Sequence, residues 1–259
     1  MIILFIIVFI NLVGFGIIIP LLPFYGEHYD ASPDQVTLLM ALYSLAQFVS
    51  APLLGKLSDK FGRRPILLFS LAGTALGYCW LALASDLNSL YLARFWGGIM
   101  AGSISSAFAS MADITTEKDR AKGMGLIGAA FGLGFIAGPA LGALLAGSDI
   151  NSTNFALPSF AAAGFSTLAL LIAFLFLKES LPLRMRHKLP QQTTIERWKD
   201  FVSKVSSPEI RTTLILTFFA VSVFAALEAT FAMWTERTFG WGVAQNGYVF
   251  AFSGILSAF

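Results

Sequence analysis

Two charged residues stand inside long apolar stretches of this sequence, where a charge is rare. Arg94 interrupts the otherwise uncharged run 87–112, and Glu228 interrupts the run 212–235. A charged side chain at membrane depth is costly and is typical of a substrate or proton pathway. The carboxyl group of Glu228 could carry a proton or bind a cationic compound. Two simpler interpretations stay open: Arg94 extends to the membrane surface, and Glu228 pairs with a basic residue elsewhere.

Other catalytic chemistry lacks the residues that it needs. An intramembrane serine protease requires a histidine inside the membrane, but His28 and His187 both fall in polar segments. Cys79 stands alone in an apolar run, without a Cys/His cluster of the zinc-binding kind. The sequence has neither a G-x-G-x-x-G run after a strand nor a G-x-x-x-x-G-K-[ST] run. We therefore expect no enzyme, no metal site and no cofactor.

The composition is that of a membrane protein. Hydrophobic residues make up 56% of the 259 residues and charged residues only 12%. A soluble domain carries about 25% charged residues, roughly twice this share. The net charge of +2 is too small to indicate a nucleic-acid partner. A lipid bilayer is the partner that these values indicate.

Eight apolar runs are long enough to cross a bilayer, which takes about 20 helical residues. They are 1–26, 35–55, 65–85, 87–112, 123–148, 150–177, 212–235 and 238–259. A transmembrane β-barrel would instead show alternating segments of about ten residues. The first run lacks the basic start and the cleavage site of a signal peptide, and its Pro20 and Pro23 predict a kinked first helix.

Basic residues gather on one side of the predicted helices. The loops 56–64, 113–122 and 178–211 hold 15 of the 17 lysines and arginines. The loops of the other side contain acidic residues, with Arg237 as their only base. Because basic loops face the cytoplasm, the even-numbered loops and the amino terminus are expected inside the cell.

The long loop after the sixth run divides the chain. We predict a six-helix unit over residues 1–177, a cytoplasmic linker over 178–211 and the start of a second unit over 212–259. In the linker, apolar residues recur at helical spacing among charges, namely Ile195, Trp198, Val202 and Val205. This spacing favours an amphipathic helix on the membrane surface, and a plain solvated helix fits equally well.

A ten-residue segment between the second and third runs places glycines, an acid and bases at fixed positions. It reads Gly55-Lys56-Leu57-Ser58-Asp59-Lys60-Phe61-Gly62-Arg63-Arg64. Gly55 would let two helices approach closely, and Gly62 would permit a tight turn. Asp59 lies in a predicted turn and can meet Arg63 four residues later. The segment resembles the G-x-L-[SA]-D-[RK]-x-G-R-[RK] signature of the major facilitator superfamily, which occurs in the same loop.

Two further elements resemble motifs of that superfamily. Arg94 is followed by Gly98 and Gly102, as in its R-x-x-x-G-x-x-x-[GA] element. The fifth run resembles the G-x-x-x-G-P-x-x-G element of its antiporter branches, through Gly134, Gly138, Pro139 and Gly142. A broad stripe of glycines on this helix is predicted to let a neighbouring helix slide at close range; its members are Gly125, Gly128, Gly132, Gly138 and Gly142.

A narrower resemblance covers the whole chain. The stretches FGIIIPLLPFY in the first run and LEATFAMWTERTFG in the seventh are similar to the tetracycline/multidrug proton antiporter group. This resemblance implies an all-α membrane protein with the major facilitator fold of two six-helix bundles, each built of inverted repeats. The chain would supply the first bundle and two helices of the second, spans 1–8 of 12, as a truncated piece.

The resemblance also implies a function. It indicates a monomeric secondary transporter of a bacterial inner membrane that exports amphipathic drugs or tetracycline-like compounds. Protons would be the second partner, and the proton gradient would supply the energy in place of a cofactor. Two alternatives remain: a uniporter or symporter of another small solute, and a non-transporting membrane protein, which a native stop after Phe259 would favour.

The same resemblance suggests roles for several residues. Arg94 would couple proton movement to the substrate. Asn11 replaces an aspartate that is common in the group, so it cannot titrate but can bond a substrate. Tyr43 and Gln47 are weaker candidates for lining the cavity, because hydrogen bonding between helices explains them as well. At the cytoplasmic face, Asp113 would pair with Arg63, and together with Asp59 and Arg64 they would form a latch that biases alternating access.

Overall fold

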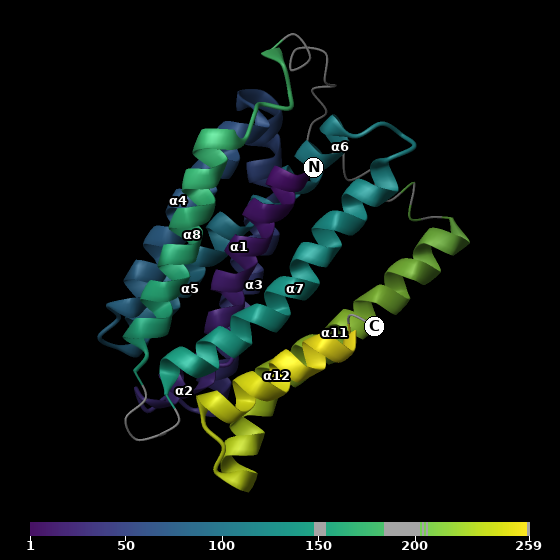
Figure 1. Cartoon of the computed structure of the whole chain (residues 1–259). Helices are drawn as coiled ribbons and strands as arrows, with labels where there is room; N and C mark the ends of the chain where they lie inside the picture. The colour runs from purple at the N-terminus through teal and green to yellow at the C-terminus, as the bar shows by residue number, and fades with distance from the viewer. Residues whose placement is uncertain (148–153, 184–202, 204, 206, 258–259) are drawn as a thin grey trace.

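The computed structural model describes residues 1–147, 154–183, 203, 205 and 207–257. These residues form helices and no strand (Figure 1). The helices are α1 (Ile2–Ile18), α2 (Leu22–Glu27), α3 (Pro33–Phe61), α4 (Arg63–Ala82), α5 (Leu87–Ala101), α6 (Ile104–Ile114), α7 (Arg120–Ala146), α8 (Ala156–Phe176), α11 (Pro208–Phe239) and α12 (Val243–Ser257). The predicted all-α membrane fold is confirmed.

Each of the eight apolar runs corresponds to helical structure. Among the described residues, five helices are long and apolar enough to cross a membrane: α3, α4, α7, α8 and α11. The first run is split into α1 and α2 around Pro20, as its prolines predict. The fourth run is also split, into α5 and α6, at Gly102 and Ser103. This second break was not predicted, because the run 87–112 contains no proline.

The helices extend beyond the apolar runs. The segment 56–64 was predicted as a loop, but α3 continues to Phe61 and α4 begins at Arg63. Asp59 therefore lies in the last turn of a helix and not in a turn between helices. The prediction was wrong because hydropathy marks the edge of the membrane, whereas a helix ends where the backbone turns. Gly62 makes that turn with a φ of 109°, which favours glycine as predicted.

Short polar signals fix the other helix ends. Ser32 and Gln35 form a capping box ahead of Pro33 at the start of α3. The carboxylate of Asp86 accepts a hydrogen bond of 2.8 Å from the backbone of Ser89 at the start of α5. At the end of α11, Gly240 adopts the left-handed conformation, with a φ of 67°.

The first eight helices pack into one bundle around α1. Helix α1 lies between α7 and α8, while α4 packs against α5 and α8, and α3 packs against α5. The buried side chains are mostly aliphatic, and the best covered of them include Ile17, Leu39 and Leu90. We call the end of the bundle that carries α2 the α2 end, and the opposite end the Arg63 end.

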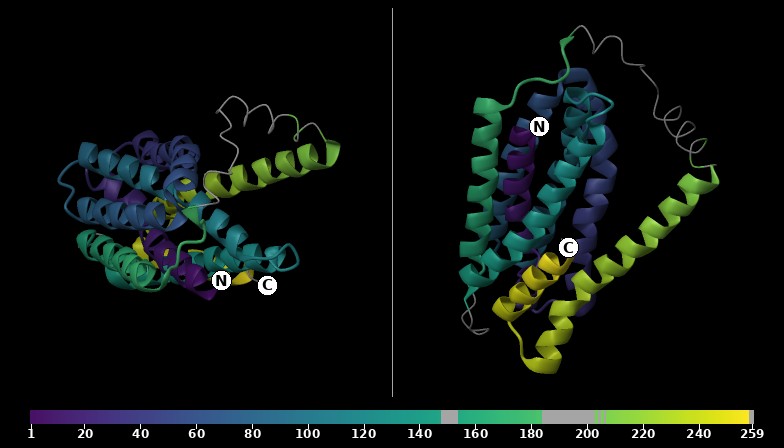
Figure 2. Two further views of the ribbon diagram at one scale, coloured as in Figure 1. Left: turned by 90° about the horizontal axis from the view of Figure 1, so that it is seen from above. Right: turned by 45° about the vertical axis from the view of Figure 1, so that its right-hand side comes forward.

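Helices α11 and α12 lie beside this bundle. Helix α12 packs along α7, whereas α11 contacts the bundle through α2 and α3 at the α2 end. From there α11 diverges from α7 toward the Arg63 end (Figure 2). Residues 208–227 of α11 are accordingly exposed. The predicted linker helix lies almost wholly outside the described residues, so it stays a prediction, as do the unit boundaries.

Candidate functional site

Arg94 lies inside the bundle, two turns from the α2 end of α5. Its side chain is buried, with a residue exposure of 6%. The guanidinium carbon is 4.1 Å from the centre of the Tyr43 ring on α3. Its Nε has no hydrogen-bond partner among the described residues. The side chain therefore does not extend to the surface, and the aromatic face attracts its charge.

The candidates Asn11, Tyr43 and Gln47 come together around one cavity. This cavity has a volume of about 150 Å³ and lies among α1, α3, α4, α5, α6 and α7. Asn11 accepts a hydrogen bond of 3.1 Å at its Oδ1 from the Ser166 hydroxyl. Gln47 donates from Nε2 to the carbonyl oxygen of Ala101, at 3.4 Å. Both amides thus join helices and also line the cavity.

Glu228 faces a second cavity, of about 240 Å³, between α7 and the helices α11 and α12. The phenyl ring of Phe135 lines both cavities. Residue Glu228 is partly buried. Arg94 in the first predicted unit and Glu228 in the second thus both lie in the interior, and Phe135 lies between the two cavities.

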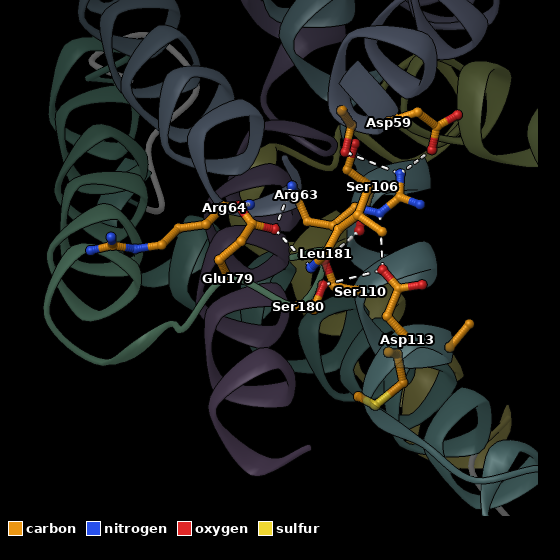
Figure 3. Close-up of polar contacts among 12 residues, drawn as sticks. Asp59, Arg63, Arg64, Ser106, Ser110, Asp113, Glu179, Ser180 and Leu181 are labelled. Atoms are coloured by element: carbon orange, nitrogen blue, oxygen red, sulfur yellow. Dashed lines mark hydrogen bonds and ion pairs between the residues drawn. The ribbon is translucent and has the colours of Figure 1, made fainter. Parts of the chain in front are cut away.

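The predicted polar cluster is present at the Arg63 end (Figure 3). Arg63 donates from Nη1 to Asp59 Oδ1 at 2.5 Å and from Nε to Asp113 Oδ2 at 3.1 Å. Its Nη1 is also 3.3 Å from the Ser58 hydroxyl. The guanidinium is nearly buried and joins α3, α4 and α6. The predicted contacts of Arg63 with Asp59 and Asp113 are thus present, and their role as a latch stays a prediction.

Glu179 belongs to the same cluster, although the sequence analysis did not select it. Its carboxylate accepts hydrogen bonds from the backbone N–H groups of Arg63 and Arg64, at 2.9 and 3.3 Å. The neighbouring Ser180 donates to Asp113 Oδ2 at 3.2 Å. A carboxylate at a helix N-terminus is stabilised by the helix dipole. The available signal in the sequence was an acidic residue two positions after the end of the apolar sixth run.

Arg64 points away from this cluster toward α8. It donates from Nη2 to the carbonyl oxygen of Phe174, at 2.6 Å. Its guanidinium carbon is also 5.8 Å from the centre of the Phe174 ring. Arg63 thus joins α4 to α3 and α6, whereas Arg64 joins it to α8.

The antiporter-type motif forms the contact between α1 and α7. A methyl group added at Gly138 would lie 2.5 Å from the Cα of Gly16, and one at Gly142 would lie 2.6 Å from the carbonyl oxygen of Ile17. Gly134 packs in the same way against Leu12. Pro139 is buried within α7, beside Gly16.

The predicted glycine stripe packs closely over only part of its length. Gly125, Gly128 and Gly132 have no atom within 4 Å of an added methyl group, so they lie on an open face of α7. Gly138 and Gly142, nearer the end of α7, instead contact α1. Gly55 does not mark a close approach either, since its added methyl group would meet Ser105 at an ordinary 3.7 Å.

The glycines that follow Arg94 do allow close packing. Methyl groups added at Gly98 and Gly102 would collide with α3, at the Tyr43 carbonyl oxygen and at the Ser50 hydroxyl. The tight contact of α3 and α5 places the Tyr43 ring over the Arg94 guanidinium.

A second polar contact, not predicted, joins α11 to α2 at the α2 end. Arg237 Nη2 is 3.3 Å from Glu27 Oε1. The Arg237 side chain is largely exposed, whereas that of Glu27 is partly buried.

The sequence matches the family description of the Major Facilitator Superfamily over residues 4–259. The chain belongs to this superfamily. It is 34% identical over 255 residues to the class B tetracycline resistance protein of Escherichia coli, a match that covers 97% of the chain and 62% of that protein. Multidrug resistance protein 2 of Bacillus subtilis strain 168 is 29% identical over 251 residues, covering 96% and 62%. The resemblance to tetracycline and multidrug resistance proteins is thus confirmed.

Solved structures of the superfamily share the fold. The human organic anion transporter MFSD10 aligns with a TM-score of 0.74 at 26% identity, covering 99% of this chain and 69% of that chain. A bacterial homologue of the lysosomal transporter Spinster aligns with a TM-score of 0.81 at 18% identity, covering 99% and 59%. The chain spans about 62% of the length of its curated relatives. With its apolar helices, it is an integral membrane protein of a transporter family.

Proposed function

We propose that the protein exports amphipathic drugs or tetracycline-like compounds in exchange for protons, by alternating access. The observation that carries this proposal is the arrangement of Arg94 and Glu228. Both lie within apolar helices: Glu228 lines one of the two cavities that share Phe135, and Arg94 packs against the ring of Tyr43, which lines the other. A carboxyl group beside a cavity and an arginine can change its protonation when its surroundings change. Intramembrane charges of this kind are expected on a proton or substrate pathway.

The two units supply the moving parts. Contact between α11 and the bundle at the α2 end, with divergence toward the Arg63 end, supports rocking of one unit against the other. In this proposal the Arg63 end faces the cytoplasm of a bacterial inner membrane, together with the amino terminus. The Arg63 cluster then biases the cytoplasmic side toward closure.

A uniporter or symporter of another solute is the second candidate. Asn11 favours this candidate, because its amide occupies the position of an aspartate that is common in the antiporter group that this chain resembles. An amide cannot carry a proton. Counterflow of such a solute without proton movement would support this candidate.

Inverted membrane vesicles that carry the protein at its full natural length test the proposal. Addition of tetracycline is expected to discharge an acid-inside gradient. Arg94→Ala and Glu228→Gln are expected to abolish this discharge without loss of membrane insertion. Gly164→Ala serves as the control, because Gly164 is an exposed position of α8 that lines neither cavity. Wild-type discharge in either charge variant, or no discharge with a broad drug panel, would refute the proposal.

A further inference from the structure

One buried hydroxyl group in the first cavity has no partner. Ser70 on α4 is 1% exposed, and its Oγ has no hydrogen-bond partner among the described residues. It lines the same 150 Å³ cavity as Asn11 and Gln47. Buried polar groups are nearly always hydrogen-bonded. An unpartnered hydroxyl that borders an empty volume therefore indicates a bound group that supplies the missing bond.

The polar groups that remain available in this cavity are neutral. The contact with Ser166 occupies Asn11 Oδ1 and leaves its amide nitrogen as a donor. The contact with Ala101 occupies Gln47 Nε2 and leaves its oxygen as an acceptor. None of the residues that line the cavity is acidic or basic. The cavity thus offers hydrogen bonds to an uncharged group and no counter-ion to a charged one.

The walls suit a flat ring. Phe15 stacks on Tyr43 with a centroid distance of 5.3 Å, and Phe135 meets Phe15 edge to face at 6.0 Å. All three side chains line the cavity. A cavity of about 150 Å³ has the size that takes up one benzene ring in a protein interior. It is too small for a whole drug molecule, for which pockets of about 300 Å³ or more are usual.

We propose that this cavity binds one neutral, oxygen-bearing ring of the transported compound, with Ser70 and Asn11 bonding the ring oxygens. The basic group of the compound then lies on the other side of Phe135, at Glu228. This assignment rests on the proposed function and narrows its substrates to amphipathic molecules with an oxygenated aromatic end and a cationic end. Ser70 determines specificity for the aromatic end.

A matched pair of small ligands tests the cavity without transport. In the purified full-length protein, ¹⁹F NMR measures binding of 4-fluorophenol and of fluorobenzene, which differ by one hydroxyl group. Ser70→Ala is expected to weaken 4-fluorophenol binding about two- to tenfold, the effect of one hydrogen bond, and to leave fluorobenzene unchanged. Tetracycline is expected to displace both ligands. Ser70→Thr, which keeps the hydroxyl group, is expected to bind 4-fluorophenol as the wild type does.

Ser106→Ala is the control variant. Ser106 is also buried and unpartnered, but it does not line the cavity. Loss of such a hydroxyl group should not unfold either variant. No 4-fluorophenol binding by the wild type, equal effects of Ser70→Ala on both ligands, or equal effects of Ser70→Ala and Ser106→Ala would overturn the assignment. Ring binding without tetracycline-driven proton movement would instead refute the proposed function alone.

Discussion

The guanidinium group of Arg94 is held by an aromatic face within a bundle of apolar helices. Cation–π attraction is stronger where both groups are desolvated, with a value of about 2 kcal/mol. The ring of Tyr43 also packs against Phe15, whose own ring touches Phe135. The position of Arg94 is therefore tied to the walls of both cavities.

Substitution of Tyr43 tests this contact. Tyr43→Leu is expected to lower the free energy of unfolding by about 1–2 kcal/mol and to weaken proton coupling, because Arg94 loses its aromatic partner. Tyr43→Phe keeps the ring face and is expected to behave like the wild type. Thermal unfolding in detergent and the vesicle assay measure the two effects. Equal behaviour of the two variants would show that the ring face does not hold Arg94.

Glu179 is the second residue whose contacts carry a prediction. Glu179→Ala is expected to lower the free energy of unfolding by about 1 kcal/mol, because the start of α4 loses its carboxylate. Glu117, an exposed acid in the segment between α6 and α7, provides Glu117→Ala as the control. Thermal unfolding of both variants measures the difference in stability. Equal unfolding temperatures of the two variants would show that Glu179 does not stabilise the Arg63 end.

At the scale of elements, the glycine contacts of α1 and α7 set the shape of the bundle. Gly138→Ala is expected to lower the free energy of unfolding by about 1–3 kcal/mol, because its methyl group would overlap the backbone of Gly16. Gly128→Ala on the open face of α7 is expected to be neutral or stabilising. Unfolding temperatures of the two variants measure the difference. A Gly138→Ala protein as stable as Gly128→Ala would contradict this packing.

The positions of most helices could be predicted from the sequence. Apolar runs locate the helices because the bilayer sets their length, and Pro20 marks the kink between α1 and α2. Helix ends were predicted less well, because α3 continues past its apolar run to Phe61. The break between α5 and α6 has no proline, and the faces of the α7 glycines depend on which helices pack there.

The site was predicted in part. Charges and motifs identified Arg94, Glu228 and Arg63, since such residues are rare in apolar helices. Ser70 could not be found in this way, because a serine in an apolar helix is common and only the cavity distinguishes it. Phe135 could not be predicted either, because its position between the two cavities depends on how α7 packs.

For the whole molecule, the contact at the α2 end defines the conformational state. Met233 of α11 is buried against Ala31 and Val36, and Arg237 pairs with Glu27 beside it. In the proposed rocking motion, α11 separates from α2 and α3 at this end, which would expose Met233 and break the Arg237–Glu27 pair.

Accessibility of a cysteine reports this equilibrium. In a Cys79→Ser background, Met233→Cys is expected to react faster with an impermeant thiol reagent when Glu27→Gln removes the acidic partner of Arg237. Rates are normalised to Asn88→Cys, an exposed position at the start of α5. Equal normalised rates with and without Glu27→Gln would contradict a role of this pair in closure.

Gradient-driven accumulation of tetracycline tests the central claim most directly. Inverted vesicles with the full-length protein are given an acid interior without ATP, and the internal drug concentration is measured against the imposed pH difference. We predict accumulation that increases with the pH difference, vanishes with a protonophore and does not respond to the gradient in Glu228→Gln. Wild-type uptake that never exceeds the external concentration, at any pH difference, would contradict proton-coupled export.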